Sequence, residues 1–152
     1  MIHVFIDDGY KASIKPSVLK KTASAVLKRV SPDRDVDLTI VIQGNEALQQ
    51  LNRQFLGNDA PTDVLSFPSD ETDPDSGRPY LGDIAISYPI AESQAAVAGH
   101  PVQSEVQLLV VHGVLHLLGY DHTSPELKSS MWQVQSEVLT SLAVQIHKLP
   151  ED

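Results

Sequence analysis

Three histidines, His112, His116 and His122, lie within eleven residues of one of the most apolar stretches of the chain, "VVHGVLHLLGYDH". His112 and His116 are four residues apart, a spacing that places two side chains one above the other on the same face of a helix. Two neighbouring imidazoles in a buried helix are costly unless every ring nitrogen finds a partner. A shared metal ion supplies such a partner, because neutral imidazole is a common metal ligand.

His122 completes the pattern of a metal site. Gly119 can adopt the left-handed backbone that ends a helix, so the short segment after it can bring His122 back towards the other two. Histidines at relative positions 0, +4 and +10 with glycine at +7 match the ligand frame of the metzincin peptidases. Three protein ligands with a fourth position open are typical of catalytic zinc. The spacing therefore predicts one catalytic metal ion, although three imidazoles also suit nickel, copper or iron.

One residue of the peptidase motif is absent. In zinc peptidases the residue after the first histidine is glutamate, the general base of the reaction, and this chain has Gly113 at that position. Glycine offers no base, which argues against peptidase or amidase chemistry by that route. A metal ion can still lower the pKa of a bound water to about 7, so hydrolysis of another bond remains open.

The elements that must position these histidines read as four strands and four to five helices. Alternating or β-rich runs predict strands near residues 1–6, 36–42, 61–68 and 81–87, and apolar stripes predict helices over 16–30, 45–57, 88–118 with a break near 98–101, and 124–142. Leu48, Leu51 and Phe55 form the predicted inner stripe of the second helix. The mixed order of four strands and about five helices indicates an α+β fold.

Composition predicts one catalytic domain over residues 1–152. The length suits a single hydrophobic core, and the lack of cysteine excludes disulfides and thiolate metal sites. No apolar run is long enough to span a membrane and the first residues do not resemble a signal peptide, so we expect a cytoplasmic protein.

The net charge of -9 disfavours general binding to nucleic acids. The charge is nevertheless polarised, with five bases and no acids over residues 15–32, and seven acids and one base over 59–83. The basic segment is either a binding face or an ordinary solvated helix face.

Four blocks of the sequence together resemble the YbeY family of bacterial rRNA maturation factors. They read "LNRQFLGND", "PTDVLSFP", "LGDIAIS" and "HGVLHLLGYDH", in this order. The resemblance implies a hydrolase of phosphodiester bonds: a metal-dependent, single-strand-specific endoribonuclease that acts in maturation of small-subunit rRNA and in ribosome quality control. It also implies a small mixed four-stranded sheet packed with about five helices, and a zincin-like placement of the histidine-bearing helix. One zinc ion per chain would be held by His112, His116 and His122.

The resemblance further implies a set of partners and a compartment. The partners are single-stranded rRNA, the small ribosomal subunit, one small-subunit ribosomal protein and a ribosome-assembly GTPase, and the compartment is the cytoplasm. Two alternatives stay open. One is a non-catalytic ribosome-assembly factor with structural zinc, and the other is a metal-dependent hydrolase of another class.

Other candidate catalytic residues are less clearly marked. Family members commonly carry arginine where this chain has Leu56, which weakens the case for phosphate stabilisation, and Arg53, one helical turn earlier, is a candidate substitute or a solvated surface residue. Asp63 and Asp83, in the two strand motifs, either act as carboxylates at the site or bond the local backbone. Asp121 either accepts a hydrogen bond from an imidazole or caps the turn before His122.

The remaining chemistry-bearing residues have structural interpretations. His3, His100 and His147 fit no metal pattern, and we expect them at the surface or at strand ends. Met131 falls on the inner stripe of the last helix and is predicted to pack in the core. The neighbouring Trp132 is predicted to be partly buried, with base stacking as the alternative.

Overall fold

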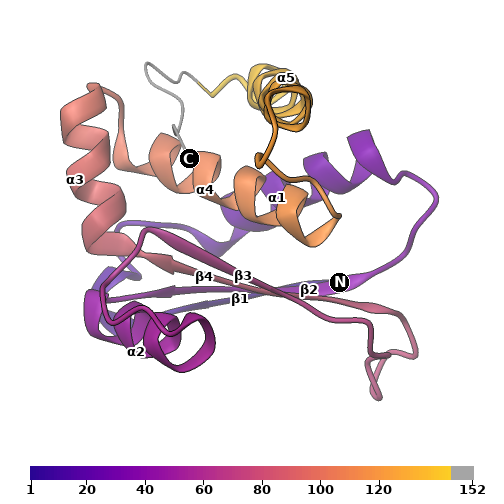
Figure 1. Ribbon diagram of the computed structural model, residues 1–152, viewed down its shortest axis with the longest axis horizontal. Helices are drawn as coiled ribbons and strands as arrows, with labels where there is room; N and C mark the ends of the chain where they lie inside the picture. Colours follow the sequence, from indigo (N-terminus) through magenta and orange to yellow (C-terminus); the bar gives the residue numbers. More distant parts are fainter. Residues whose placement is uncertain (145–152) are drawn as a thin grey trace.

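The computed structural model describes residues 1–144 and builds them from one sheet and two unequal layers of helices (Figure 1). The strands are β1 (Ile2–Ile6), β2 (Asp37–Gln43), β3 (Val64–Pro68) and β4 (Tyr80–Ser87). The helices are α1 (Pro16–Val30), α2 (Asn45–Leu56), α3 (Tyr88–Ala98), α4 (Val102–Leu117) and α5 (Pro125–Ser141), with a short 3-10 helix at Asp8–Tyr10. The α+β class and the mixed four-stranded sheet are confirmed.

The sheet has the strand order β1-β2-β4-β3. Strands β1, β2 and β4 are parallel, and β3 pairs antiparallel with β4. Helix α1 makes the crossover between β1 and β2, as parallel neighbours require, whereas β3 and β4 are joined by the hairpin connection at residues 69–79. Strand β3 is therefore an edge strand, and within residues 1–144 the backbone N–H and C=O groups on its outer side are not paired with another strand.

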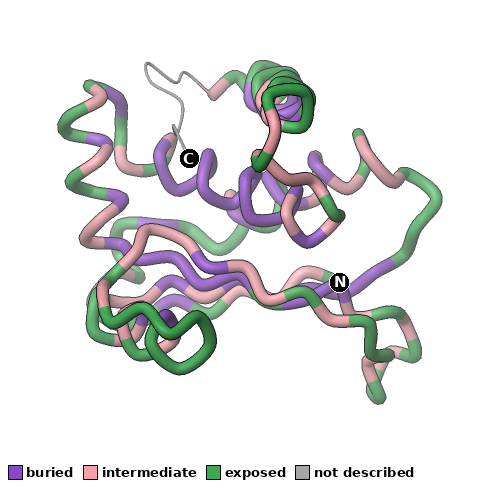
Figure 2. Tube along the Cα trace, in the orientation of Figure 1, coloured by how far each residue is buried: buried purple, intermediate pink, exposed green. Residues whose placement is uncertain are grey.

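Helix α4 lies at the centre of the molecule. It contacts strands β3 and β4 and helices α1, α3 and α5, and almost all of its residues from Glu105 to Leu117 are buried, as the purple trace in Figure 2 shows. A helix that is apolar all round is expected in such a position. Helix α2 alone covers the opposite face of the sheet, where Leu48 packs on Leu65 and Ala85 (Figure 1).

The hairpin connection at residues 69–79 is anchored by Asp37, which is 1% exposed. Arg78 Nε donates a hydrogen bond of 2.7 Å to Asp37 Oδ1, and Ser76 Oγ donates one of 2.7 Å to Oδ2. The amino group of Met1 also donates to Oδ1, at 2.6 Å. Burial by itself raises the pKa of Asp37, but these three donors outweigh it and hold the pKa well below its usual range.

Two side chains differ from the sequence-based expectation. His100 is 6% exposed rather than at the surface, because it follows the end of α3 at Gly99 and its Nε2 lies 2.6 Å from Oε1 of Glu105 on α4. Phe55 is 57% exposed rather than on the inner stripe. Phe55 lies in the last turn of α2, and its ring meets that of Phe67 on the edge strand β3 edge-on, with the ring centroids 5.2 Å apart.

Other assignments agree with the structure. Met131 is fully buried in the core and Trp132 is half-buried. His3 lies on the edge strand β1 and is also half-buried. His147 falls outside the described residues.

Candidate metal centre

The end of α4 delivers the three histidines to one place. His112 and His116 share a face of the helix, and the chain leaves it through Gly119, whose φ of 97° is accessible mainly to glycine. The backbone N–H groups of Gly119 and Tyr120 donate to the carbonyl oxygens of His116 and Leu115 at 3.0 and 2.9 Å, so the turn satisfies the last carbonyls of the helix. The next residues then return His122 to the same face.

The geometry of the three rings suits one metal ion. A ring nitrogen from each of the three histidines lies within 4.8 Å of the other two, and Nε2 of His112 is 3.0 Å from Nε2 of His116. A tetrahedral ion bonded at 2.0–2.1 Å separates its nitrogen ligands by about 3.4 Å. Small side-chain rotations therefore suffice for the three nitrogens to hold an ion such as zinc.

Another group of possible ligands among residues 1–144 is less suitable. His3, Asp37 and Asp73 also lie within 4.8 Å of one another, but both carboxylate oxygens of Asp37 already accept hydrogen bonds, one of them from Arg78. A metal cation at this place would be repelled by the guanidinium group of Arg78, which already forms an ion pair with Asp37.

His112 has a second partner that the sequence analysis did not identify. Its Nδ1 lies 2.7 Å from Oε1 of Gln135 on α5, while its Nε2 faces His116. The available signal was the pattern of α5, in which Gln135 is a polar residue on the buried face with Met131, Val134 and Val138. A buried amide in an apolar stripe needs a hydrogen-bond partner, and here the partner is an imidazole.

Gly113 explains why the peptidase glutamate is absent. The residue after His112 faces the sheet, and a Cβ atom at this position would lie 2.9 Å from Cγ2 of Ile84. The Gly113 carbonyl also accepts a hydrogen bond of 3.3 Å from Ser66 Oγ on β3. Helix α4 therefore packs too closely on β4 and β3 for a larger side chain, and a base at this position would point away from the histidines.

A cleft of about 330 Å³ opens beside the three rings, between α4 and the edge strand β3. Its lining comprises Leu56, Thr62, Asp63, Val64, Leu65, Ser66, Pro68, Leu109 and the three histidines. Of the candidate catalytic residues, the cleft lining therefore includes Asp63, and it includes Leu56 at the position where arginine is common. Among residues 1–144, no Lys or Arg belongs to this lining.

The carboxylates of Asp63 and Asp121 are engaged near the site. Asp63 Oδ1 accepts from the backbone N–H of Val64 at 2.7 Å, and its Oδ2 accepts from Gln94 Nε2 of α3 at 3.4 Å. Asp121 accepts from the backbone N–H of His122 at 2.7 Å, and this bond lowers the pKa of the carboxyl group. Asp121 thus caps the turn that presents His122.

The structure does not bring Asp83 and Arg53 into the cleft. Because alternate residues of a strand face opposite sides of the sheet, Asp83 points away from α4 while Ile84 points towards it. Asp83 accepts a short hydrogen bond from Tyr80, whose pKa is raised to about 12, chiefly by burial. Arg53 lines a separate hollow on α2 together with Glu46 and Asp59.

An aromatic side chain flanks the histidines on the side of α5. The Trp132 ring centroid lies 5.7 Å from those of both His112 and His122, edge-on to each. Lys128 Nζ lies 5.5 Å from the Trp132 ring centroid, within the range of a cation–π contact. The three histidines therefore have a half-buried aromatic side chain beside them on the side of α5.

Among residues 1–144, none of the helices combines the length and the apolar content that crossing a lipid bilayer requires.

Comparison with known proteins gives one consistent result. A family model described as "Endoribonuclease YbeY" matches residues 6–143. The protein of that name from Chloroflexus aurantiacus is 43% identical over 150 residues, which cover 94% of this chain and 96% of the relative. The corresponding protein of Corynebacterium kroppenstedtii is 40% identical over 146 residues, covering 91% and 72%.

A solved structure has the same fold. The solution structure of TM1509 from Thermotoga maritima matches with a TM-score of 0.58 and 28% sequence identity, covering 94% of this chain and 92% of that one.

Proposed function

The chain belongs to the YbeY endoribonuclease family, and from this membership we propose that it cleaves single-stranded RNA at one zinc ion held by His112, His116 and His122. The observation that carries the proposal is the convergence of three imidazole nitrogens, all within 4.8 Å, at the wall of an open cleft. Three histidines leave a coordination position for a substrate, as in catalytic zinc sites. A bound zinc ion supplies the Lewis acid for cleavage of the phosphodiester.

Two features of the structure support a position for the RNA phosphate in the cleft beside the histidines. His112 and His116 come from a buried helix, so their positions are held by packing on all sides. Strand β3 forms the facing wall, and its length admits an extended, single-stranded backbone. A cleft of about 330 Å³ is too small to enclose both strands of an RNA duplex, so the cleft favours single strands.

Uncharged donors replace the usual arginine in this proposal. The backbone N–H of Ser87 donates a hydrogen bond to the carbonyl of Asp63, and the N–H of Ser69 donates one to the carbonyl of Leu81. In β3 the odd-numbered residues therefore direct their backbone N–H and C=O groups towards β4. Ser66 therefore directs its backbone N–H away from β4, towards the cleft that it lines. This N–H is suited to a phosphate oxygen. The hydroxyl of Thr62, in the same lining, makes a long hydrogen bond of 3.4 Å to Asp63 Oδ1 and can rotate to donate to a second phosphate oxygen.

We also propose that the RNA is single-stranded rRNA of the small ribosomal subunit and that the enzyme acts in its maturation and in ribosome quality control, in the cytoplasm. A small-subunit ribosomal protein and a ribosome-assembly GTPase are the proposed partners. Family membership supports this proposal. Co-sedimentation of the purified chain with precursor small subunits tests it, with mature large subunits as the control.

The experiment on the chemistry compares the zinc-loaded protein with its His112→Ala and His116→Ala variants. Elemental analysis measures the bound metal, and cleavage of a short single-stranded RNA is followed with and without a chelator. We expect both variants to lose metal and activity together, and cleavage that survives in metal-free protein would overturn the proposal. Analysis of product ends separates the routes, since attack by the RNA 2′-hydroxyl leaves a 2′,3′-cyclic phosphate and attack by water does not.

A second candidate is a non-catalytic ribosome-assembly factor that keeps structural zinc. The presence of Leu56, in place of a cation, in the lining of the cleft favours it. It predicts a rigorously purified, zinc-loaded chain that binds small ribosomal subunits but leaves single-stranded RNA uncut.

A further inference from the structure

We propose that Gln135 is a positioning residue for the metal centre, whose side-chain carbonyl keeps the proton of His112 on Nδ1 and so leaves Nε2 to face the other two histidines. The inference rests on the proposed function in one respect, which is that His112, His116 and His122 bind one metal ion. The role of Gln135 in setting the tautomer of His112 concerns this chain alone and can be measured without metal.

The first argument is the separation of the two ring nitrogens of His112. Nδ1 lies 2.7 Å from Gln135 Oε1, inside the protein, and Nε2 lies 3.0 Å from Nε2 of His116, at the cleft. A neutral imidazole has one N–H donor and one acceptor nitrogen. Because a carbonyl oxygen can only accept, its contact with Nδ1 requires the proton there and leaves the lone pair on Nε2.

The second argument is the burial of Gln135 itself. The side chain is 0% exposed, and its Nε2 has no hydrogen-bond partner among the described residues. Burying an amide with one unpaired end is unfavourable, and a leucine or methionine would fill this place in the stripe of α5 at no such cost. The carbonyl contact with His112 is therefore the feature that accounts for a polar residue here.

The third argument is that Gln135 is neutral. Ligating histidines commonly donate their second N–H to a carboxylate, a carbonyl or water, and this partner fixes the ring and tunes its basicity. An amide orients the ring of His112 without adding a negative charge beside the site. A carboxylate at the same place would make the same contact and pull more strongly on the proton, so it should bind the metal at least as tightly.

The experiment uses two variants and a matched control. Gln135→Met keeps the approximate volume and removes the acceptor, and Gln135→Glu keeps an acceptor. Gln133→Met makes the same exchange on the exposed face of the same helix. For each full-length protein, 15N NMR of the imidazoles reports the tautomer of His112 without metal, competition with a chelator gives the zinc affinity, and urea unfolding gives the folded fraction.

We expect the wild type to hold His112 with its proton on Nδ1. Gln135→Met should move population to the other tautomer and weaken zinc binding about 10- to 100-fold. Gln135→Glu should restore both properties, and Gln133→Met should change neither. A role in packing alone would leave the tautomer unmoved.

Two results would overturn the inference and leave the proposed function standing. One is a folded Gln135→Met variant with the wild-type tautomer and a zinc affinity within about twofold of wild type. The other is a wild-type His112 with its proton mainly on Nε2, which decides the matter even if the methionine variant does not fold. A chain that binds zinc in a manner dependent on Gln135 but cuts no RNA would overturn only the proposed nuclease activity, whereas a chain that binds no divalent metal would overturn both.

Discussion

At the scale of single residues, Leu56 has the largest bearing on how well this chain handles phosphate. It is the last residue of α2 and is 64% exposed. It lines the same cleft as the three histidines. A leucine there offers no hydrogen bond to a phosphodiester. An arginine at the same point could bond two phosphate oxygens at once through its planar fork.

We predict that Leu56→Arg increases kcat/KM for a short single-stranded RNA about tenfold, since a hydrogen bond to a charged group contributes about 1.5–3 kcal/mol. Stability should change by less than about 0.5 kcal/mol because position 56 is exposed. Steady-state cleavage kinetics of the zinc-loaded protein measure the effect.

Gln50→Arg is the matched control for added charge, because Gln50 lines the separate hollow on α2 with Arg53. It should alter kcat/KM by less than about twofold, and so should Arg53→Leu. An equal increase in kcat/KM for Leu56→Arg and Gln50→Arg would mean that the added charge acts at long range and that an arginine at position 56 makes no specific contact with the phosphate.

At the scale of elements, the helix that bears the histidines could be predicted because its signals are local. The apolar run, the histidine spacing and the glycine after it all lie within α4 and its exit. The start of α5 was equally clear, and Ser124 Oγ does accept from the backbone N–H of Leu127 at 3.2 Å. Such signals depend on neighbours along the chain, which the sequence displays directly.

Features that depend on contacts between elements far apart in the sequence could not be predicted. Asp83 faces away from α4 because α4 packs on the other face of β4. The sequence of one strand shows that alternate residues face opposite sides of the sheet, but it does not show which side a helix covers. The bond between Gln135 and His112 joins positions 23 residues apart on two helices. Phe55 fitted a helical stripe, but at the end of α2 its side chain stays 57% exposed beside Phe67 on the edge strand β3.

The contact between α4 and β4 gives an element-scale prediction at Gly113. In Gly113→Ala the new Cβ would lie 2.9 Å from Cγ2 of Ile84, and this methyl group is stiff because the side chain is β-branched. Overpacking costs about 1–3 kcal/mol, while alanine gains about 1 kcal/mol of helix propensity over glycine. We expect a net loss of about 1 kcal/mol in the free energy of unfolding, measured with urea, together with weaker zinc binding as α4 shifts.

The paired change Gly113→Ala with Ile84→Ala tests this cause. Removing the Ile84 side chain leaves room for the new methyl group, so the two losses in stability should add up to more than the loss in the double variant. Strict additivity would show that Gly113 and Ile84 do not limit how closely α4 packs on the sheet.

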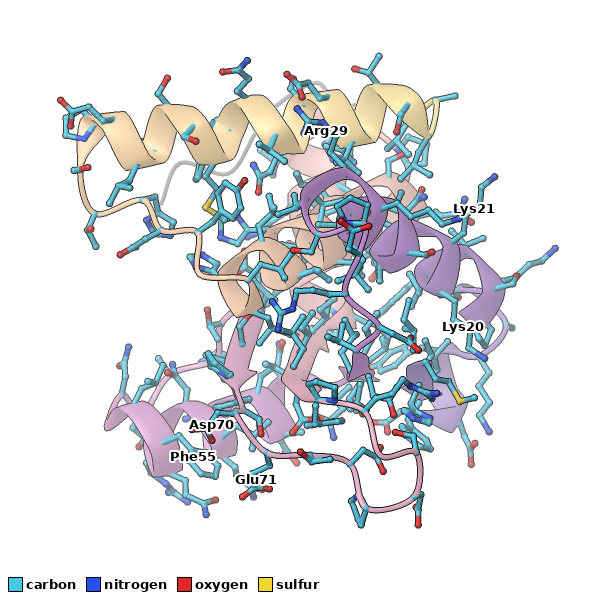
Figure 3. All side chains as sticks on the ribbon, turned by 90° about the vertical axis from the view of Figure 1, so that its right-hand side faces the viewer. Lys20, Lys21, Arg29, Phe55, Asp70 and Glu71 are labelled. Carbon is cyan, nitrogen blue, oxygen red and sulfur yellow. The ribbon has the colours of Figure 1, made fainter. Side chains whose placement is uncertain are left out.

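At the scale of the whole molecule, charge is distributed unevenly. Lys20 and Lys21 project from α1 on one side of the view in Figure 3, and Asp70 and Glu71 lie on the other side, near the end of α2. Arg29 is already paired with Glu137 of α5 at 2.5 Å. With a net charge of -9, the molecule as a whole repels RNA, so the proposed binding of RNA in the cleft would depend on short-range contacts there.

The most deeply buried charge, Asp37, links stability to pH. Its pKa is held below the usual range by the amino group of Met1, Arg78 and Ser76, in spite of burial. A group whose pKa is lowered by folding stabilises the protein above its unfolded pKa, about 3.9 for aspartate, and loses that contribution as pH falls towards the folded value. We predict that Asp37→Asn lowers the free energy of unfolding by about 2–3 kcal/mol at pH 7, because it leaves buried donors facing a neutral amide.

Urea unfolding at pH 7, 5 and 3.5 measures the difference between wild type and variant. The difference should be full at pH 7 and 5 and should shrink at pH 3.5, where Asp37 is mostly protonated in the unfolded chain and the wild type loses part of its advantage. Asp35→Asn is the matched control, since Asp35 lies 3.9 Å from Arg78 Nε but its side chain is 83% exposed. It should cost less than about 0.5 kcal/mol at each pH. A difference for Asp37→Asn that stays constant across this pH range would mean that the lost packing of the hairpin connection, and not the lost charge, destabilises the protein.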